Sequence, residues 1–88
     1  MVRIVLPAGW TQGHKTEFSG TEGLLPDVIR TFVTDNPEFR HRLLGPNEQL
    51  LTYINLCIDE DLIPRHLRND SVVGQDCTVT VIAPMAGG

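Results

Sequence analysis

The sequence is poor in the patterns that nucleotide-binding, nucleic-acid-binding and metal-binding proteins use. It has no G-x-x-x-x-G-K-S/T loop to hold the phosphates of ATP. Eleven acidic side chains outnumber seven basic ones, and the net charge of −4 disfavours binding to nucleic acid or to anionic membranes. The two cysteines and three histidines are scattered without the spacing of metal ligands. We therefore expect no bound metal or cofactor and no nucleic-acid partner.

Long hydrophobic runs are also missing. No apolar stretch approaches the roughly 20 residues that span a bilayer, and no cationic start leads into the apolar stretch of a secretory signal. These absences favour a cytoplasmic protein without a membrane partner. Hydrophobic residues nevertheless make up 41% of the 88 residues, against 20% charged, which is typical of one folded domain.

The first part of the chain predicts two strands and a helix. Apolar residues alternate along residues 2–6, which predicts a strand, and residues 15–18 predict a return strand after a loop at 10–13. From Leu25 the apolar positions follow the spacing of an amphipathic helix, and Pro26 belongs in its first turn.

The second part predicts a short helix and three more strands. Asn36 suits the N-cap of a helix that ends before Gly45. We expect strands at residues 51–58 and 62–63 and from Val79 onward, with residues 65–73 irregular or forming a single helical turn. Helices on one face of a mixed sheet make an α+β domain.

The end of the chain has a pattern of its own. Pro84 is expected to interrupt strand pairing because it lacks a backbone N–H. After Met85 and Ala86 the sequence reads Gly87-Gly88. Glycines, which lack a Cβ, can thread a channel too narrow for other residues and carry a terminal carboxylate into another protein's active site. That carboxylate is ionised at neutral pH, so it must be activated before a nucleophile attacks it. Chain ends of this composition are also common sites of disorder.

The order of elements and this ending together resemble the ubiquitin-like sulfur carriers (the ThiS/MoaD family), which include the small subunit of molybdopterin synthase and the sulfur carrier of thiamine biosynthesis. The most specific part runs from Asp76 to Gly88, and residues 28–43 and 53–56 look closest to the carriers that feed cysteine synthesis. The resemblance implies a β-grasp fold at residues 1–83, with a mixed sheet of four to five strands packed on one main helix and the last strand in the centre. It also implies a flexible tail at residues 84–88.

The same resemblance implies a protein cosubstrate rather than an enzyme. An adenylating (ubiquitin-activating-like) enzyme would use ATP to activate the carboxylate of Gly88, and a sulfur source would displace AMP. The resulting thiocarboxylate would donate sulfide to a biosynthetic enzyme that makes cysteine, a cofactor or a sulfur-containing natural product. Pro84, Met85 and Ala86 would line the partner's channel, and Gly87 would keep the tail thin. Met85 stands where smaller β-branched residues are common in the family.

Ile82 is a further candidate contact for the partner. If Val79 and Val81 face the helix, Ile82 points to the opposite face of the sheet, beside the tail. It would there either anchor the partner or pack under a loop.

Two other functions fit the same ending. A ubiquitin-like modifier would form an isopeptide bond between Gly88 and lysines of other proteins, and the tail alone does not separate that role from sulfur transfer. A β-grasp binding module would carry the two glycines incidentally.

Several other residues are candidates for a site. Cys57 and Cys77 would lie on neighbouring strands of a β-grasp sheet, so a disulfide is conceivable, although reduced cysteines are the rule in the cytoplasm. Residues 59–61 are three adjacent acids, which we expect to point into solvent, and residues 40–42 form a small basic group that fits a solvated helix face. Trp10 would be either a partner contact or a lid over the edge of the core.

Overall fold

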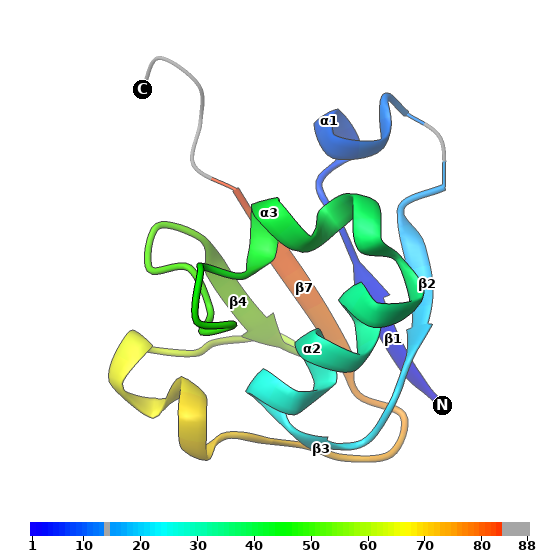
Figure 1. The fold of residues 1–88 in the computed structure, drawn as a ribbon. Coiled ribbons are helices and arrows are strands. Elements are labelled where there is room, and N and C mark those ends of the chain that lie inside the picture. The colour runs from blue at the N-terminus through cyan, green and yellow to red at the C-terminus, as the bar shows by residue number, and fades with distance from the viewer. Residues whose placement is uncertain (14, 84–88) are drawn as a thin grey trace.

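The protein is built from a five-stranded mixed sheet with its main helix packed across one face (Figure 1). The computed structural model describes residues 1–13 and 15–83, so the predicted tail at residues 84–88 lies outside the described residues. The strand order of the large sheet is β2-β1-β7-β4-β5, and β3 and β6 form a separate two-stranded sheet. The elements are β1 (Val2–Val5), α1 (Ala8–Thr11), β2 (Glu17–Gly20), β3 (Gly23–Leu24), α2 (Leu25–Asp35), the 3-10 helix η1 (Pro37–Phe39), α3 (Arg40–Leu43), β4 (Asn55–Ile58), β5 (Asp61–Leu62), the 3-10 helix η2 (Arg65–Asp70), β6 (Val72–Val73) and β7 (Thr78–Ile82).

The last strand, β7, lies in the centre of the large sheet. It runs parallel to β1, with Val5 opposite Thr80, and antiparallel to β4, with Ile58 opposite Val79. β2 and β5 extend the sheet on either side as antiparallel neighbours of β1 and β4. This is the α+β, β-grasp arrangement that the sequence predicted, with the last strand between its neighbours.

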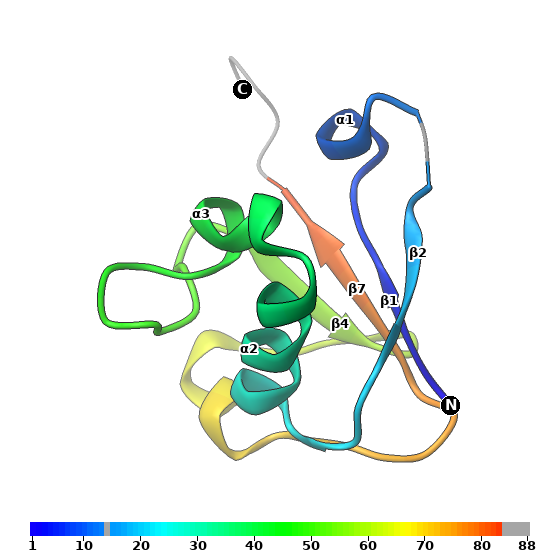
Figure 2. The same ribbon diagram turned by 45° about the vertical axis from the view of Figure 1, so that its right-hand side comes forward.

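The core lies between α2 and the sheet (Figure 2). The apolar stripe that predicted the helix is entirely buried, and Pro26 is in the first turn as expected. The rings of Phe18, Phe32 and Phe39 pack together with centroids 5.3–6.0 Å apart. The residues of the helix stripe and of the facing sheet that are no more than 3% exposed are Leu25, Val28, Ile29, Phe32, Val33, Val2, Ile4, Leu56, Val79 and Val81.

The prediction of a loop at residues 10–13 is wrong, because Trp10 lies inside the one-turn helix α1. The backbone N–H of Trp10 donates to the carbonyl of Pro7, and Gln12 ends the turn in the left-handed region at φ 55°. A single turn is too short to produce a periodic apolar pattern, so this helix has no signal in the sequence. The return strand β2 begins at Glu17, two residues later than predicted.

Asn36 is at the N-cap position of η1 with Pro37 after it, as predicted, but its side chain does not make the expected capping bond. No side-chain capping bond forms there, and the amide of Asn36 instead donates to the carbonyl of Phe32 at 3.1 Å. Asn36 therefore satisfies the free end of α2, while Pro37 opens η1 and leads into α3.

The strand predicted at residues 51–58 is shorter than expected, because β4 begins only at Asn55. The carbonyls of Leu51 and Ile54 accept hydrogen bonds from the guanidinium of Arg68, so residues 51–54 form a loop tied to η2. In the region 65–73, residues Arg65–Asp70 form η2, which is longer than the single helical turn expected as one alternative, and Val72–Val73 pair with β3, which the sequence did not predict.

The remaining candidate residues are placed plainly. Both cysteines are free, and Cys57 lies opposite Thr80 rather than opposite Cys77, so the conceivable disulfide is not formed. Residues 59–61 are exposed as expected, and the carboxylate of Asp59 accepts a hydrogen bond from the backbone N–H of Thr78 at 3.0 Å.

The described residues show neither a membrane-spanning helix nor a cluster of metal ligands. Over residues 1–13 and 15–83, no helix has the length and apolar character needed to cross a membrane. Over the same ranges, no three His, Cys, Asp or Glu side chains are grouped in a way that could hold a metal ion.

The packing of the sheet against α2 predicts a contrast between two leucines on neighbouring strands. Leu56 is 0% exposed, whereas Leu62 is 59% exposed. We expect Leu56→Ala to lower the free energy of unfolding by about 2–5 kcal/mol, because it leaves a cavity in the core. Leu62→Ala, the matched control, should change it by no more than about 0.5 kcal/mol. Urea denaturation measures both, and equal effects would contradict the assigned faces of β4 and β5.

Candidate functional site

The chain leaves the sheet at the end of β7, which lies between α1 and α3 in the view of Figure 2. β7 is paired on both sides, and its last residue, Ile82, lies opposite Asn55 of β4. The position of Ala83 is therefore set by the sheet itself. The predicted tail contacts, Pro84 to Ala86, and the predicted acyl-bearing end, Gly87 and Gly88, lie outside the described residues.

Within residues 1–13 and 15–83, no helix covers the face of the sheet that is turned away from α2 (Figure 2). Val79 and Val81 are buried toward α2, so Ile82 points to the open face, where its side chain is 44% exposed. The row Val5, Thr80, Cys57 and Leu62 crosses the same face, because these residues are direct neighbours in the strand register. No described loop covers Ile82, and its role as a partner anchor stays a prediction.

A second surface lies on the helical side of the exit. It is a pocket of about 230 Å³ whose walls come from α1, α3, the loop at 51–54 and the residue after β7. Trp10 is half-buried and packs against the core, which fits the predicted lid over the edge of the core. Trp10 also lines this pocket. The Arg42 guanidinium lies over the Trp10 ring, 5.4 Å from its centroid. The pocket is lined by Trp10, His41, Arg42, Tyr53, Ile54 and Ala83.

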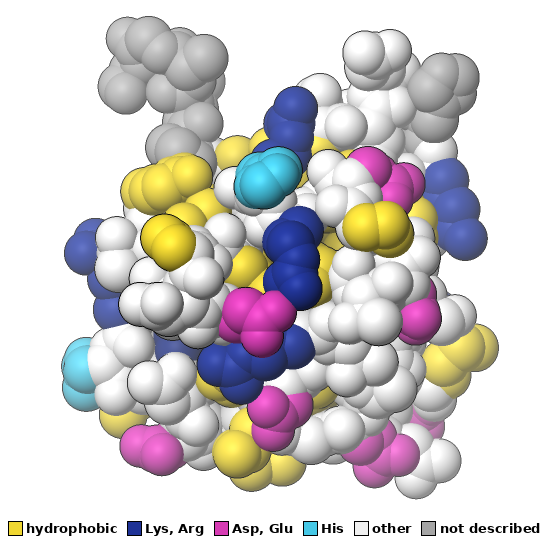
Figure 3. All heavy atoms as spheres, in the orientation of Figure 1, with side chains coloured by type: hydrophobic (Ala, Val, Ile, Leu, Met, Phe, Trp, Pro, Cys, Tyr) yellow, Lys and Arg dark blue, Asp and Glu magenta, His cyan; other side chains and the backbone are white. Residues whose placement is uncertain are grey.

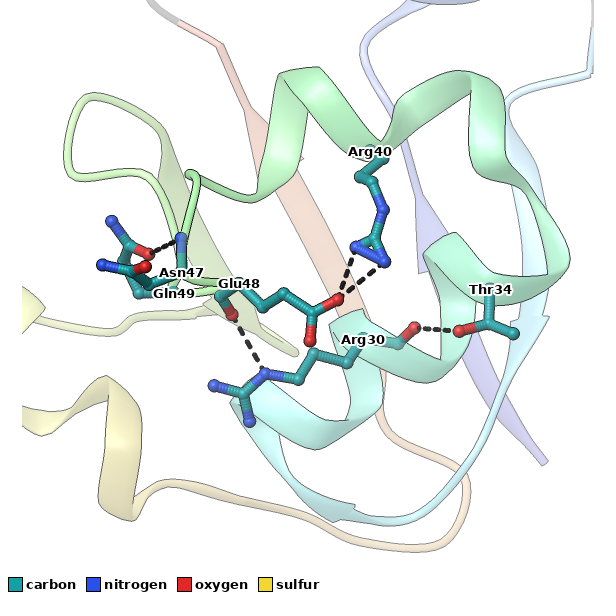
Figure 4. Close-up of polar contacts among 6 residues, drawn as sticks. All are labelled: Arg30, Thr34, Arg40, Asn47, Glu48 and Gln49. Carbon is teal, nitrogen blue, oxygen red and sulfur yellow. Dashed lines mark hydrogen bonds and ion pairs between the residues drawn. The ribbon is translucent and has the colours of Figure 1, made fainter.

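The basic residues of α3 have different surroundings. Both terminal nitrogens of Arg40 donate to one carboxylate oxygen of Glu48, at 2.7 and 2.8 Å, and the Arg30 side chain donates to the backbone carbonyl of Glu48 (Figure 4). These bonds hold the loop that follows α3 against α2 and α3. Arg42 has no carboxylate within ion-pair distance among the described residues. The prediction of a solvated basic face therefore holds: His41 and Arg42 are exposed, and the side chain of Arg40, which is 42% exposed, is paired with Glu48 at the surface.

Arg68 holds the loop at 51–54 that forms one wall of the pocket, a role that the sequence did not predict. Its side chain is 4% exposed, and it donates to the carbonyls of Leu51 and Ile54, which flank Tyr53. Burial lowers the pKa of the Arg68 guanidinium, and the nearby charge of Arg65 lowers this pKa further. Arginine remains protonated in proteins, so the group stays a cation that donates hydrogen bonds to two loop carbonyls. A lone arginine in an irregular segment gives no sequence signal of this role.

The geometry of this region suits recognition rather than catalysis. Basic side chains form a column down the middle of the helical face, with a group of hydrophobic side chains at the upper left (Figure 3). The described residues that line the pocket include one histidine and no acid or thiol, so among them there is no nucleophile with a base oriented beside it. Two exposed surfaces, the open sheet face at Ile82 and the pocket at Trp10, instead meet where the chain leaves the sheet.

The structure is similar to several solved ones. A chain of the Amycolatopsis orientalis BexX/CysO complex matches with a TM-score of 0.80 and 19% identity, covering 100% of both chains. Mycobacterium tuberculosis CysO, an antigen, matches with a TM-score of 0.76 and 17% identity over 97% of this chain and 100% of that one. Small archaeal modifier protein 1 of H. volcanii matches with a TM-score of 0.72 and 12% identity over 96% of this chain and 97% of that one.

These matches confirm the β-grasp fold over the whole length of the compared chains. At such low identity they show the fold alone. No family model matches the sequence, and no curated protein matches it either.

The buried position of Arg68 predicts a measurable role in stability. Arg68→Met should lower the free energy of unfolding by about 1–3 kcal/mol for each loop carbonyl that it leaves unsatisfied. Arg65→Met is the matched control, because Arg65 is an exposed residue of the same 3-10 helix. Urea denaturation of the two variants tests this, and an unchanged Arg68→Met protein would show that water replaces the guanidinium.

Proposed function

We propose that this protein is a sulfur carrier that cycles between a carboxylate and a thiocarboxylate at Gly88. The observation that carries the proposal is the course of the chain, in which the central strand β7 leads directly into a Pro-Met-Ala-Gly-Gly ending. A strand paired on both sides provides a rigid base, and the glycines after it are narrow enough for a partner's channel. The full-length likeness to CysO of two organisms supports the same role.

The proposed chemistry occurs in a partner's active site. The carboxylate of Gly88 attacks the α-phosphorus of ATP, which releases pyrophosphate and leaves an acyl-adenylate. Hydrosulfide, or an equivalent sulfur nucleophile, then attacks the acyl carbon and expels AMP, with loss of one proton. Hydrolysis or transfer of the thiocarboxylate in a biosynthetic enzyme returns the carboxylate and delivers the sulfur. The chain itself contributes the acyl group and the surfaces that its partners recognise, so it acts as a cosubstrate.

Two partners follow from this chemistry, an adenylating enzyme and a sulfide-accepting synthase. A solved BexX/CysO complex contains a chain of this fold together with another protein. This supports complex formation as part of the function. We propose cysteine, a cofactor or a sulfur-containing natural product as the destination of the sulfur.

A second candidate is a ubiquitin-like modifier. It is favoured by the likeness to small archaeal modifier protein 1 of H. volcanii. A lysine amine would then attack the activated Gly88 carbonyl in place of the sulfur nucleophile, and an isopeptide bond would form. Activation is the same in both cases, so the nucleophile decides between them.

The sulfur-carrier proposal predicts a defined change in intact mass. The full chain is incubated with ATP, sulfide and a carrier-adenylating enzyme, and mass spectrometry is expected to show one oxygen replaced by sulfur. The chain lacking Gly88 is the control and should show no change. Products linked to lysines, formed without any thiocarboxylate, would favour the modifier; no activation of Gly88 by an enzyme that activates its own carrier would overturn both functions.

The open face of the sheet predicts a contact with the adenylating enzyme. Ile82→Asp should weaken binding to that enzyme by about tenfold or more, because it places a charge in the buried part of the interface. Val72→Asp is the matched control, since Val72 is also a β-branched strand residue and is 67% exposed on the separate two-stranded sheet. Titration calorimetry measures both, and unchanged affinity of the Ile82 variant would remove Ile82 as an anchor.

A further inference from the structure

The pocket beside Ala83 combines aromatic walls with unpaired positive charge. Trp10 comes from α1, Arg42 from α3 and Tyr53 from the loop at 51–54, so residues far apart in the sequence meet at one place. Tryptophan, tyrosine and arginine are the residue types that contribute most to binding energy at protein interfaces. Their convergence at the exit of the chain is what distinguishes this pocket from the other hollows of the surface.

The charge of this pocket is opposite to that of the protein. The chain carries a net charge of −4, yet of its described residues His41 and Arg42 line the pocket and no Asp or Glu does. Arg40, the neighbouring cation, is neutralised by Glu48. Arg42 has no such partner among the described residues, and the Trp10 ring beneath it holds its planar donor group in place. A planar guanidinium that is held but unpaired is suited to a carboxylate.

The walls of the pocket are held in place before any partner binds. Trp10 is half-buried on the core, and the loop that carries Tyr53 is fixed by the two hydrogen bonds from buried Arg68. α3 is anchored by Leu43, which is fully buried. A preformed site loses little conformational entropy on binding, so a small contact area is sufficient for a useful contribution to affinity.

We propose that this pocket is the docking site for a short acidic segment of the enzyme that engages the tail, a segment with carboxylates for Arg42 and one apolar side chain for Trp10 and Tyr53. The inference rests on the proposed function, because it gives that same partner a second point of contact. Five residues follow Ala83 and span at most about 17 Å when extended, so an enzyme that holds Gly88 must bring its own surface close to the pocket. The partner would then contact Ile82 on the open face of the sheet and the pocket on the helical side, on either side of the end of β7.

The test does not depend on the adenylating enzyme. The full chain, labelled with ¹⁵N, is titrated with the peptide acetyl-Glu-Asp-Phe-Asp-Glu-amide, and NMR is expected to show shifts at Trp10, His41, Arg42 and Tyr53. Arg42→Glu should weaken this binding by roughly tenfold, in line with the loss and reversal of a close charge pair. Arg65→Glu makes the same change in net charge at an exposed site on η2 and should leave binding unchanged.

Several results would overturn the inference. Equal binding of the peptide in which Gln and Asn replace the acids would show that charge is not recognised. Equal weakening by Arg65→Glu would show attraction to overall charge rather than to this pocket. Shifts at the pocket caused by ATP or AMP but not by the peptide would assign it to a nucleotide instead.

The proposed function and this inference fail in distinguishable ways. If peptide binding maps to the pocket but no thiocarboxylate forms at Gly88, the docking site stands and the sulfur-carrier function is wrong. With an active adenylating enzyme, Arg42→Glu should raise the KM for the carrier by roughly tenfold at low salt, with kcat unchanged and the difference lost at high salt. An unchanged KM at low salt would exclude the pocket from the interface with that enzyme.

Discussion

The double-sided pairing of β7 is the constraint on which the rest of the structure depends. A parallel neighbour on one side and an antiparallel neighbour on the other place the last strand beside the first in the middle of the sheet, with the start of β1 and the end of β7 at opposite ends of these strands. Parallel pairing of β1 and β7 requires a crossover, and α2 provides it on one face. Because Val79 and Val81 must both face that helix, a register slip of one residue would expose them, so the point at which the chain leaves the sheet is fixed.

Guanidinium groups hold the parts of the structure that regular elements do not. Arg68 holds the loop at 51–54 through two backbone carbonyls, and Arg30 and Arg40 hold the loop after α3 through the backbone and side chain of Glu48. Each of these arginines is used structurally. Arg42 is the contrasting case, since it lies over Trp10 beside the chain exit without an acidic partner among the described residues.

The two exposed surfaces fit the proposed role, in which enzymes recognise this chain as a cosubstrate. If sulfur is transferred through Gly88, all bond making takes place in the partner, and this chain contributes the surfaces that the partner recognises. The open sheet face offers an apolar contact at Ile82, and the helical side offers a basic and aromatic one at Trp10 and Arg42. A partner that contacts both faces would distinguish this protein from others of the same fold, because electrostatic complementarity contributes mainly to specificity.

The sequence alone determined the elements whose pattern is local. Alternation in residues 2–6, the helical spacing after Leu25 and the β-branched run from Val79 predicted β1, α2 and β7, because the burial of each residue follows from its own neighbours in the chain. The Gly-Gly ending was likewise visible in the sequence. The tertiary structure decided what depends on distant partners: the pairing of β3 with β6, the shortening of β4 by Arg68, and the pocket at the chain exit. None of these has a periodic signal, because each arises only when segments far apart in the sequence are brought into contact. The single turn α1 is local, but it is too short to produce a periodic pattern.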